Sequence, residues 1–232
     1  MERVVVTGAS SGIGAATVEM FRGHGIEVLG VDVSASSDAD EHFAIDLSRS
    51  DCGERVLEFC AGRPIDGLVN NAARSLDKLA VDTSSEDFDE ILNVNLRAPF
   101  LVASSLQPVL ASRKGFVVNV ASVHAVATSI GVSVYATSKG GLVSMTRALA
   151  LEWAPDVRVT AILPGAVDTE MLRSGLDRTS SSLQEYSGRQ PMGRVGAAGE
   201  IADAVWFLAN SEFSTGSTLI VDGGATARLS SE

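Results

Sequence analysis

Short apolar runs rich in valine and isoleucine alternate with longer stretches of helical periodicity along the whole sequence. Most of these runs are apolar at consecutive positions, which is typical of parallel strands covered by helices on both faces. The alternation predicts βαβ units and an α/β fold, with one doubly wound parallel sheet of about seven strands and helices on both faces. The expected strands are Arg3–Thr7, Ile26–Asp32, His42–Asp46, Asp66–Asn70, Gly115–Ala121, Val157–Leu163 and Ser217–Val221. The expected helices are Gly12–His24, Ser50–Ala61, Ser84–Ala111, Ser133–Trp153 and Ala198–Asn210.

No linker, repeat or low-complexity segment divides the 232 residues, so we expect a single domain over 1–232. The least regular stretch is 168–196, which is rich in Ser, Arg and Gly. Long irregular segments in compact α/β domains are usually functional, and we expect this one to form a lid over a substrate. The alternative is a tolerated surface insertion.

The chain is acidic, with a formal net charge of −11. Such a surface repels nucleic-acid phosphates and anionic lipids, which argues against nucleic-acid and membrane partners. No apolar run reaches the roughly 18 residues of a membrane span, and the valine-rich first strand leaves no room for a signal peptide, so we expect a cytoplasmic protein. The two cysteines lack disulfide or metal spacing and are expected to be buried thiols on a helix. No His, Cys and Asp cluster has metal-ligand spacing, and we expect no metal.

A glycine-rich turn follows the first strand and leads directly into a helix. Glycines at such a turn bend the chain, let the backbone approach a pyrophosphate and let helix pack on strand, while the helix N-terminus supplies N–H groups. The spacing differs from G-x-G-x-x-G, because Thr17 stands where the last glycine would be. Taken alone, the loop could also be an ordinary tight turn. Its predicted phosphate-binding residues are Gly8, Ser10, Ser11, Gly12, Ile13 and Gly14.

An acidic residue, Asp32, ends the second strand. A carboxylate there can accept hydrogen bonds from an adenosine ribose and repels a 2′-phosphate. Neither Val33 nor Ser34 supplies a cation for that phosphate, so the pattern predicts NAD as the cofactor. By itself Asp32 could also be a strand-end cap. Asp46 and Leu47 end the third strand where a side chain could meet the adenine, although an Asp at the end of a strand often only caps the next turn.

Further motifs occur in chain order and extend over essentially the whole sequence. They are Asn70-Asn71-Ala72-Ala73, Asn93-Val94-Asn95, Ser122, Tyr135-x-x-x-Lys139, Pro164-Gly165, Val167-x-Thr169 and Val221-Asp222-Gly223-Gly224. Together with Thr7-Gly8-x-x-x-Gly12-Ile13-Gly14, this ordered set closely resembles the short-chain dehydrogenase/reductase family. The resemblance implies a single Rossmann-type dinucleotide-binding catalytic domain. Two positions depart from the family pattern: Ala73 and Ala98 each stand where glycine is commoner, which affects fine geometry and no reacting group.

Tyr135 and Lys139 lie four residues apart, which places both on one face of a helix. A lysine ammonium there would lower the pKa of the phenol from its ordinary value of about 10 toward one useful for a general base. Ser122 comes from the end of a neighbouring strand, where its hydroxyl can donate to a substrate oxygen. The alternative is an amphipathic pair with a solvated lysine, but Ser122 and the glycine loop argue against it.

The resemblance assigns further roles by position. Asn95 would interrupt its helix and hold a water that relays protons through Lys139, and Lys139 would also bind the nicotinamide ribose. The Val167 backbone and the Thr169 hydroxyl would hold the carboxamide. The remaining residues implied to bind the cofactor are Asn71, Ala72, Pro164 and Gly165.

These features predict an NAD-dependent oxidoreductase that interconverts a secondary alcohol and a ketone, with Tyr135 as its general acid/base. One alternative is a reductase of 3-oxoacyl thioesters, against which Asp32 counts because such enzymes commonly take NADP. Another is a non-catalytic dinucleotide-binding protein, which would be expected to have lost Ser122, Tyr135 or Lys139. His124 could line the pocket or be an ordinary surface residue. The resemblance also implies a homo-oligomer, a tetramer. No motif specifies the substrate, whose pocket we expect to be formed by the segments after Asn71 and Ser122 and by the 168–196 lid.

Overall fold

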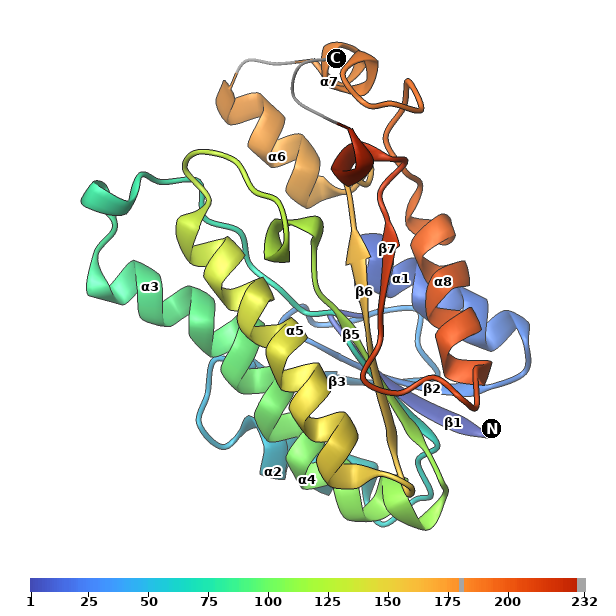
Figure 1. Cartoon of the computed structure of the whole chain (residues 1–232). Helices are drawn as coiled ribbons and strands as arrows, with labels where there is room; N and C mark the ends of the chain where they lie inside the picture. The colour runs from blue at the N-terminus through green and yellow to red at the C-terminus, as the bar shows by residue number, and fades with distance from the viewer. Residues whose placement is uncertain (180–181, 229–232) are drawn as a thin grey trace.

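A parallel sheet forms the centre of the molecule, with the strand order β3-β2-β1-β4-β5-β6-β7 (Figure 1). The structure is a computed structural model that describes residues 1–179 and 182–228, and within these ranges the sheet has seven strands. The expected doubly wound fold is confirmed. The strands are β1 (Arg3–Thr7), β2 (Glu27–Asp32), β3 (Glu41–Ala44), β4 (Gly67–Asn70), β5 (Phe116–Val120), β6 (Arg158–Pro164) and β7 (Thr218–Val221).

Two layers of helices cover the sheet. Helices α1 (Gly12–Gly23) and α8 (Ala198–Asn210) pack on one face. The opposite face carries α2 (Cys52–Cys60), α4 (Ala98–Ser112) and α5 (Ser133–Trp153) (Figure 1).

The consecutive valines of β1 show why its sequence does not alternate between apolar and polar. Val4 and Val6 belong to the core under α1 and α8, whereas Val5 belongs to the core under α2 and α4. Successive side chains of a strand point to opposite faces, so a strand buried on both faces must be apolar throughout.

The long helix expected over Ser84–Ala111 is divided. It consists of α3 (Ser85–Leu92), a π-helical turn η2 (Asn93–Arg97) and then α4. The expected interruption at Asn95 is therefore confirmed. The start of α3 is fixed by a capping box, in which the Ser84 hydroxyl accepts the Asp87 N–H and the Asp87 carboxylate accepts the Ser84 N–H.

The expectation of an irregular stretch over 168–196 is wrong, because this segment holds two helices, α6 (Glu170–Thr179) and α7 (Leu183–Gly188). Helix α7 begins at a second capping box between Ser182 and Glu185. Both helices lie beyond the carboxyl end of β6 (Figure 1). Short 3-10 turns complete the described chain at η1 (Ala80–Asp82), η3 (Val123–Ala125) and η4 (Ala225–Ala227).

The third strand ends earlier than expected, at Ala44 rather than Asp46. Asp46 instead closes a local turn, since its carboxylate accepts the backbone N–H of Ser48 at 2.8 Å. Such side-chain-to-backbone bonds compete with strand pairing.

A series of buried side-chain hydrogen bonds connects α5 to the sheet. Asn70 Nδ2 of β4 donates to Asn119 Oδ1 of β5 at 2.9 Å, and Asn119 Nδ2 donates to Thr146 Oγ1 of α5 at 2.9 Å. All three side chains are buried, so each bond would be costly to break. Because α5 carries Tyr135 and Lys139, these hydrogen bonds also fix the positions of those two side chains.

None of the helices in the described ranges is both long enough and apolar enough to cross a membrane.

Candidate active site

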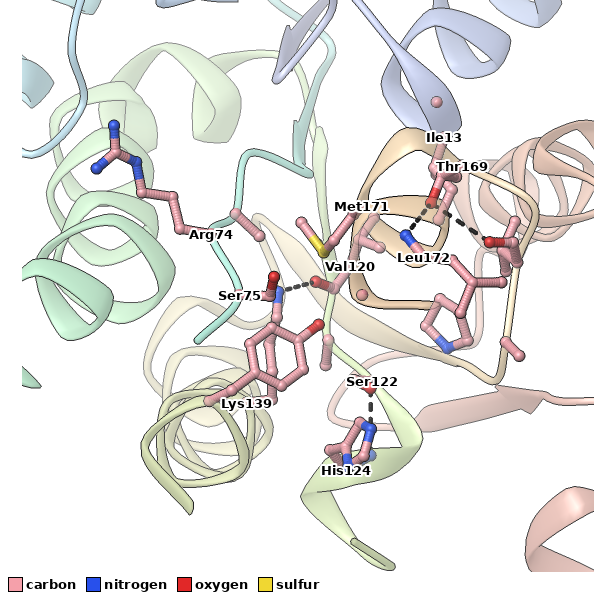
Figure 2. A pocket seen from close by; sticks show the side chains of 18 of the residues that line it. Ile13, Arg74, Ser75, Val120, Ser122, His124, Lys139, Thr169, Met171 and Leu172 are labelled. Atoms are coloured by element: carbon pink, nitrogen blue, oxygen red, sulfur yellow. Dashed lines mark hydrogen bonds between the residues drawn. The ribbon is translucent and has the colours of Figure 1, made fainter. Parts of the chain in front are cut away.

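A cavity of about 990 Å³ opens at the carboxyl ends of the parallel strands. It is continuous from the glycine loop after β1 to helices α6 and α7, and Figure 2 shows it from close by. Most of the residues predicted from the sequence line it: Gly8, Ser11, Gly12, Ile13, Asp32, Asp46, Leu47, Asn71, Ala72, Ser122, Tyr135, Lys139, Pro164, Gly165, Val167 and Thr169. The predicted residues Ser10, Gly14 and Asn95 are not part of this lining.

The glycine loop is too tight for side chains. Gly8 and Gly12 have φ values of +67° and +52°, which favour glycine. A Cβ on Gly14 would lie 1.8 Å from the carbonyl oxygen of Gly8. Asn71 directly follows β4, the neighbour of β1 in the sheet. Its side chain holds the loop by donating to the Thr7 and Gly8 carbonyls at 3.1 and 3.0 Å.

The start of α1 fits an anionic group. Its N-cap, Ser11, makes no side-chain capping hydrogen bond, and Ser11, Gly12 and Ile13 all line the cavity. The first N–H groups of a helix have no partner within it, and the helix dipole puts positive charge at this end. With glycines allowing close backbone approach, the site suits the pyrophosphate of a dinucleotide.

Asp32 stands at one end of the cavity as an ionised carboxylate. It accepts the N–H groups of Ser10 at 3.0 Å and Ser34 at 2.9 Å. Burial raises the pKa of Asp32, but these hydrogen bonds together outweigh it, and the pKa lies below its ordinary value. Ser10 thus supports the acid rather than lining the cavity, and its own hydroxyl donates to the Ser36 carbonyl.

Asp46 lies at the same end and is also ionised. The hydrogen bond from the Ser48 N–H lowers the pKa of Asp46 more than burial raises it. Two carboxylates therefore mark the end of the cavity where the second and third strands finish.

Ser122, Tyr135 and Lys139 converge at the middle of the cavity, as predicted. Ser122 lies just after the end of β5, and the other two share one face of α5. Lys139 is 2% exposed, and its Nζ lies 5.7 Å from the centroid of the Tyr135 ring. Nζ donates to the Val120 carbonyl at 2.8 Å (Figure 2).

Burial dominates the electrostatics of this group. It raises the pKa of Tyr135, and the Ser122 side-chain hydrogen bond only partly offsets this. Burial also lowers the pKa of Lys139 to about 8. The expected lowering of the Tyr135 pKa is therefore wrong for these surroundings, because burial penalises the tyrosinate more than its neighbours stabilise it. At neutral pH the phenol keeps its proton.

Asn95 braces the site from behind. Its Oδ1 accepts the Arg74 N–H at 2.8 Å, and its Nδ2 donates to the Arg74 carbonyl at 2.8 Å and to Ser138 Oγ at 3.1 Å. Ser138 Oγ in turn donates to the Tyr135 carbonyl at 2.7 Å. Asn95 thus connects the loop after β4 to α5 at Tyr135, and its role in a proton relay stays a prediction.

The departure from the family pattern at Ala73 is accommodated. Among the described non-glycine residues, positive φ values occur at Ala61 and Lys114 alone, so Ala73 adopts a backbone conformation open to any residue. Ala73 lines the cavity, and Ala98 is buried at the start of α4.

A set of lining residues around the substrate end was not predicted residue by residue, although the segments after Asn71 and Ser122 and the stretch 168–196 were expected to form a substrate pocket. The loops after β4 and β5 do line the cavity, beyond strand carboxyl ends. Residues of α6 and α7 line it as well, and no sequence motif singled out which of them would do so. His124, left open by the sequence, does line the cavity. The set includes Ser75, Asp77, Thr128, Ile130, Met171, Leu176, Tyr186, Arg189, Gln190 and Thr226.

Known proteins resemble this chain over almost its full length. The family model described as "Enoyl-(Acyl carrier protein) reductase" matches residues 8–226. An uncharacterized short-chain type dehydrogenase/reductase of Sinorhizobium fredii is 39% identical over 95% of this chain, which spans 43% of that relative's length. A 3-oxoacyl-[acyl-carrier-protein] reductase of Chlamydia trachomatis is 33% identical over 95% of each chain. The solved structure of Thermoplasma acidophilum aldohexose dehydrogenase superposes with a TM-score of 0.94 and 30% identity, covering 99% of this chain and 95% of that one.

The fold and the site define an oxidoreductase that binds a nicotinamide dinucleotide. The chain belongs to the short-chain dehydrogenase/reductase family.

We expect Gly14→Ala to weaken NADH binding by about tenfold or more, because its methyl group would displace the Gly8 carbonyl and open the phosphate loop. The measurement is a titration of NADH fluorescence. Gly23→Ala in the same helix is the matched control, since a Cβ there meets nothing within 4 Å. Equal affinity in the two variants would mean that the loop does not hold the dinucleotide.

Proposed function

We propose that the protein interconverts a secondary alcohol and a ketone with NAD as its cofactor and Tyr135 as the general acid/base. The observation that carries the proposal is one continuous cavity that joins Ser122, Tyr135 and Lys139 to the glycine loop and to Asp32. The non-catalytic alternative is not favoured, because the three reactive side chains are present and lie together.

Each of the three side chains has a task that its surroundings define. The Ser122 hydroxyl accepts the His124 N–H at 3.2 Å, and its own proton, which the Tyr135 phenol accepts here, can turn to orient a substrate oxygen. Tyr135 gives its proton to that oxygen as a ketone is reduced, and takes it back as an alcohol is oxidised. The raised pKa of Tyr135 keeps that proton in place for reduction.

Lys139 acts on the substrate oxygen indirectly, by stabilising the ionised form of the Tyr135 phenol. With a pKa of about 8 it is mostly protonated at pH 7, so its charge favours the tyrosinate that forms in the reaction. When bound, the nicotinamide accepts or gives the hydride. Asn71, Pro164, Gly165, Val167 and Thr169 are the residues that would hold and orient it.

A second candidate is reduction of 3-oxoacyl thioesters, favoured by the name of the Chlamydia trachomatis relative. The aldohexose dehydrogenase structure supports alcohol oxidation instead. A panel of secondary alcohols, ketones and a 3-oxoacyl thioester, assayed by NADH absorbance, separates the two candidates.

We expect Tyr135→Phe to lose turnover by about 10² to 10⁴-fold while NADH still binds, because only the ionisable hydroxyl is removed. Steady-state kinetics and an NADH titration on the same preparation measure both quantities. A variant that keeps most of its kcat would remove Tyr135 from the mechanism.

The preference for NAD rests on Asp32. Its ionised carboxylate can accept from both ribose hydroxyls, whereas a 2′-phosphate would meet like charge. Val33 and Ser34 line the same end of the cavity and bring no cation. Arg74 also lines the cavity, but it forms an ion pair with Glu90 of α3.

We expect kcat/KM to favour NAD over NADP by at least about a hundredfold. The double variant Asp32→Ala/Val33→Arg should narrow or reverse this ratio, since it removes the repulsion and supplies a phosphate partner. Both ratios are measured at a fixed substrate concentration, with Val33→Arg alone as the control. Equal use of NADP by the unmodified protein would overturn the assignment.

We also propose a homotetramer. Helices α4 and α5 expose the apolar side chains Phe100 and Leu151, which are 46% and 83% accessible and would suit contacts with other copies. Sedimentation at micromolar concentration should show a species larger than the 24.1 kDa chain. A monomer alone under these conditions would contradict the proposal.

The proposed location is the cytoplasm. Cys52 and Cys60 are both buried, free thiols on α2, which suits a reducing compartment.

A further inference from the structure

Two loops meet at the cavity wall beside Ser122, Tyr135 and Lys139. The loop after β4 brings Asp77, and the turn η3 after β5 brings His124; both residues line the cavity. The loops are joined where the Lys78 N–H donates to the Gly131 carbonyl at 2.7 Å. His124 and Asp77 therefore belong to one connected wall.

His124 is held in place from three sides. Its Nδ1 lies 3.0 Å from Thr128 Oγ1, and its backbone N–H donates to Ser122 Oγ (Figure 2). Its ring packs edge-on against Tyr135, with centroids 5.7 Å apart and an interplanar angle of 81°. Because Thr128 holds Nδ1, Nε2 is the ring nitrogen that remains for a ligand. The contacts with Ser122 and Tyr135 place it next to the two groups that hold the reacting oxygen.

The charges of this wall suit a hydroxyl group. Burial lowers the pKa of His124 more than the Asp77 carboxylate raises it, so the imidazole is neutral at pH 7. A neutral imidazole offers one donor or one acceptor, and a carboxylate accepts from a hydroxyl. A carboxylate on the substrate would instead meet the negative charge of Asp77.

We propose that His124, together with Asp77, binds a second oxygen of the substrate, a hydroxyl on the carbon next to the reacting carbon. The substrates are then vicinal diols and the corresponding 2-hydroxy ketones, including polyhydroxylated compounds. This assignment rests on the proposed alcohol–ketone reaction and names its substrate class.

The test uses three matched alcohols: cyclohexanol, cyclohexane-1,2-diol and 2-hydroxycyclohexane-1-carboxylate. Their dissociation constants are measured by calorimetry on Tyr135→Phe protein saturated with NAD, so that no turnover is needed. The diol should bind about tenfold tighter than cyclohexanol, because one more hydrogen-bonded group is satisfied, and the carboxylate should bind weakest. The same order is expected for kcat/KM in the unmodified protein.

Substitution of His124 in that background tests its part. His124→Phe keeps a flat ring against the aromatic ring at position 135 but removes both nitrogens, so the ratio of diol to cyclohexanol affinity should fall toward one. His124→Gln supplies an amide group in their place and should restore part of the ratio. His24→Phe, which lies outside the cavity on the α1 side of the molecule, is the matched control and should leave the ratio as it was.

Several outcomes would overturn the proposal. A ratio unchanged by His124→Phe would show that His124 does not contact the second oxygen. Tightest binding of the carboxylate would assign the wall to an anion, and no measurable binding of the diol would reject the substrate class. Failure of the proposed reaction is seen separately, as an unmodified protein that reduces NAD with none of the secondary alcohols.

Discussion

Both faces of the central sheet are covered, and most of the molecule's organisation depends on this constraint. The side chains of Val4, Val5 and Val6 pack into two different cores. No position in the middle of β1 faces solvent, so none of them can carry a polar functional side chain. Polar chemistry is displaced to the carboxyl ends of the strands. Asn119 and Thr146 are exceptions inside the core; they satisfy one another and support the site, since they fix α5 against β5.

At Tyr135 and Lys139, burial and charge have opposing effects. Burial disfavours a charged Lys139 and a charged Tyr135 alike, yet the reaction requires one positive and one transiently negative group side by side. The Val120 carbonyl holds the ammonium at 2.8 Å and offsets part of its loss of water. The dry surroundings strengthen the attraction once the phenol gives up its proton.

The sequence was sufficient for the strands, the glycine loop and the meeting of Ser122, Tyr135 and Lys139, because each depends on local patterning or on the rule that parallel strands end at one edge. It was insufficient where polar segments fold against the rest of the molecule. Helix α7 begins at the Ser182 capping box, a short signal within a stretch of serines. The direction of the Tyr135 pKa shift also could not be predicted, since spacing places a lysine near a phenol but does not say how deeply both are buried. Asn95 was expected at a helix interruption, whereas its bonds to Arg74 and Ser138 depend on a loop and a helix far away in the chain.

The π-helical turn at Asn93–Arg97 determines how far α3 is rotated about its axis relative to α4. An α-helix turns by about 100° per residue, so the wider turn rotates α3 relative to the direction that an unbroken helix would give it. Loss of one residue there would restore continuous winding and swing the outer face of α3 round by that angle. It would also release Asn95 from the positions it bridges. A change in the length of this segment would therefore disturb more than a change of side chain along α3, because the π-helical turn also holds Val94 at the cavity and Asn95 against α5.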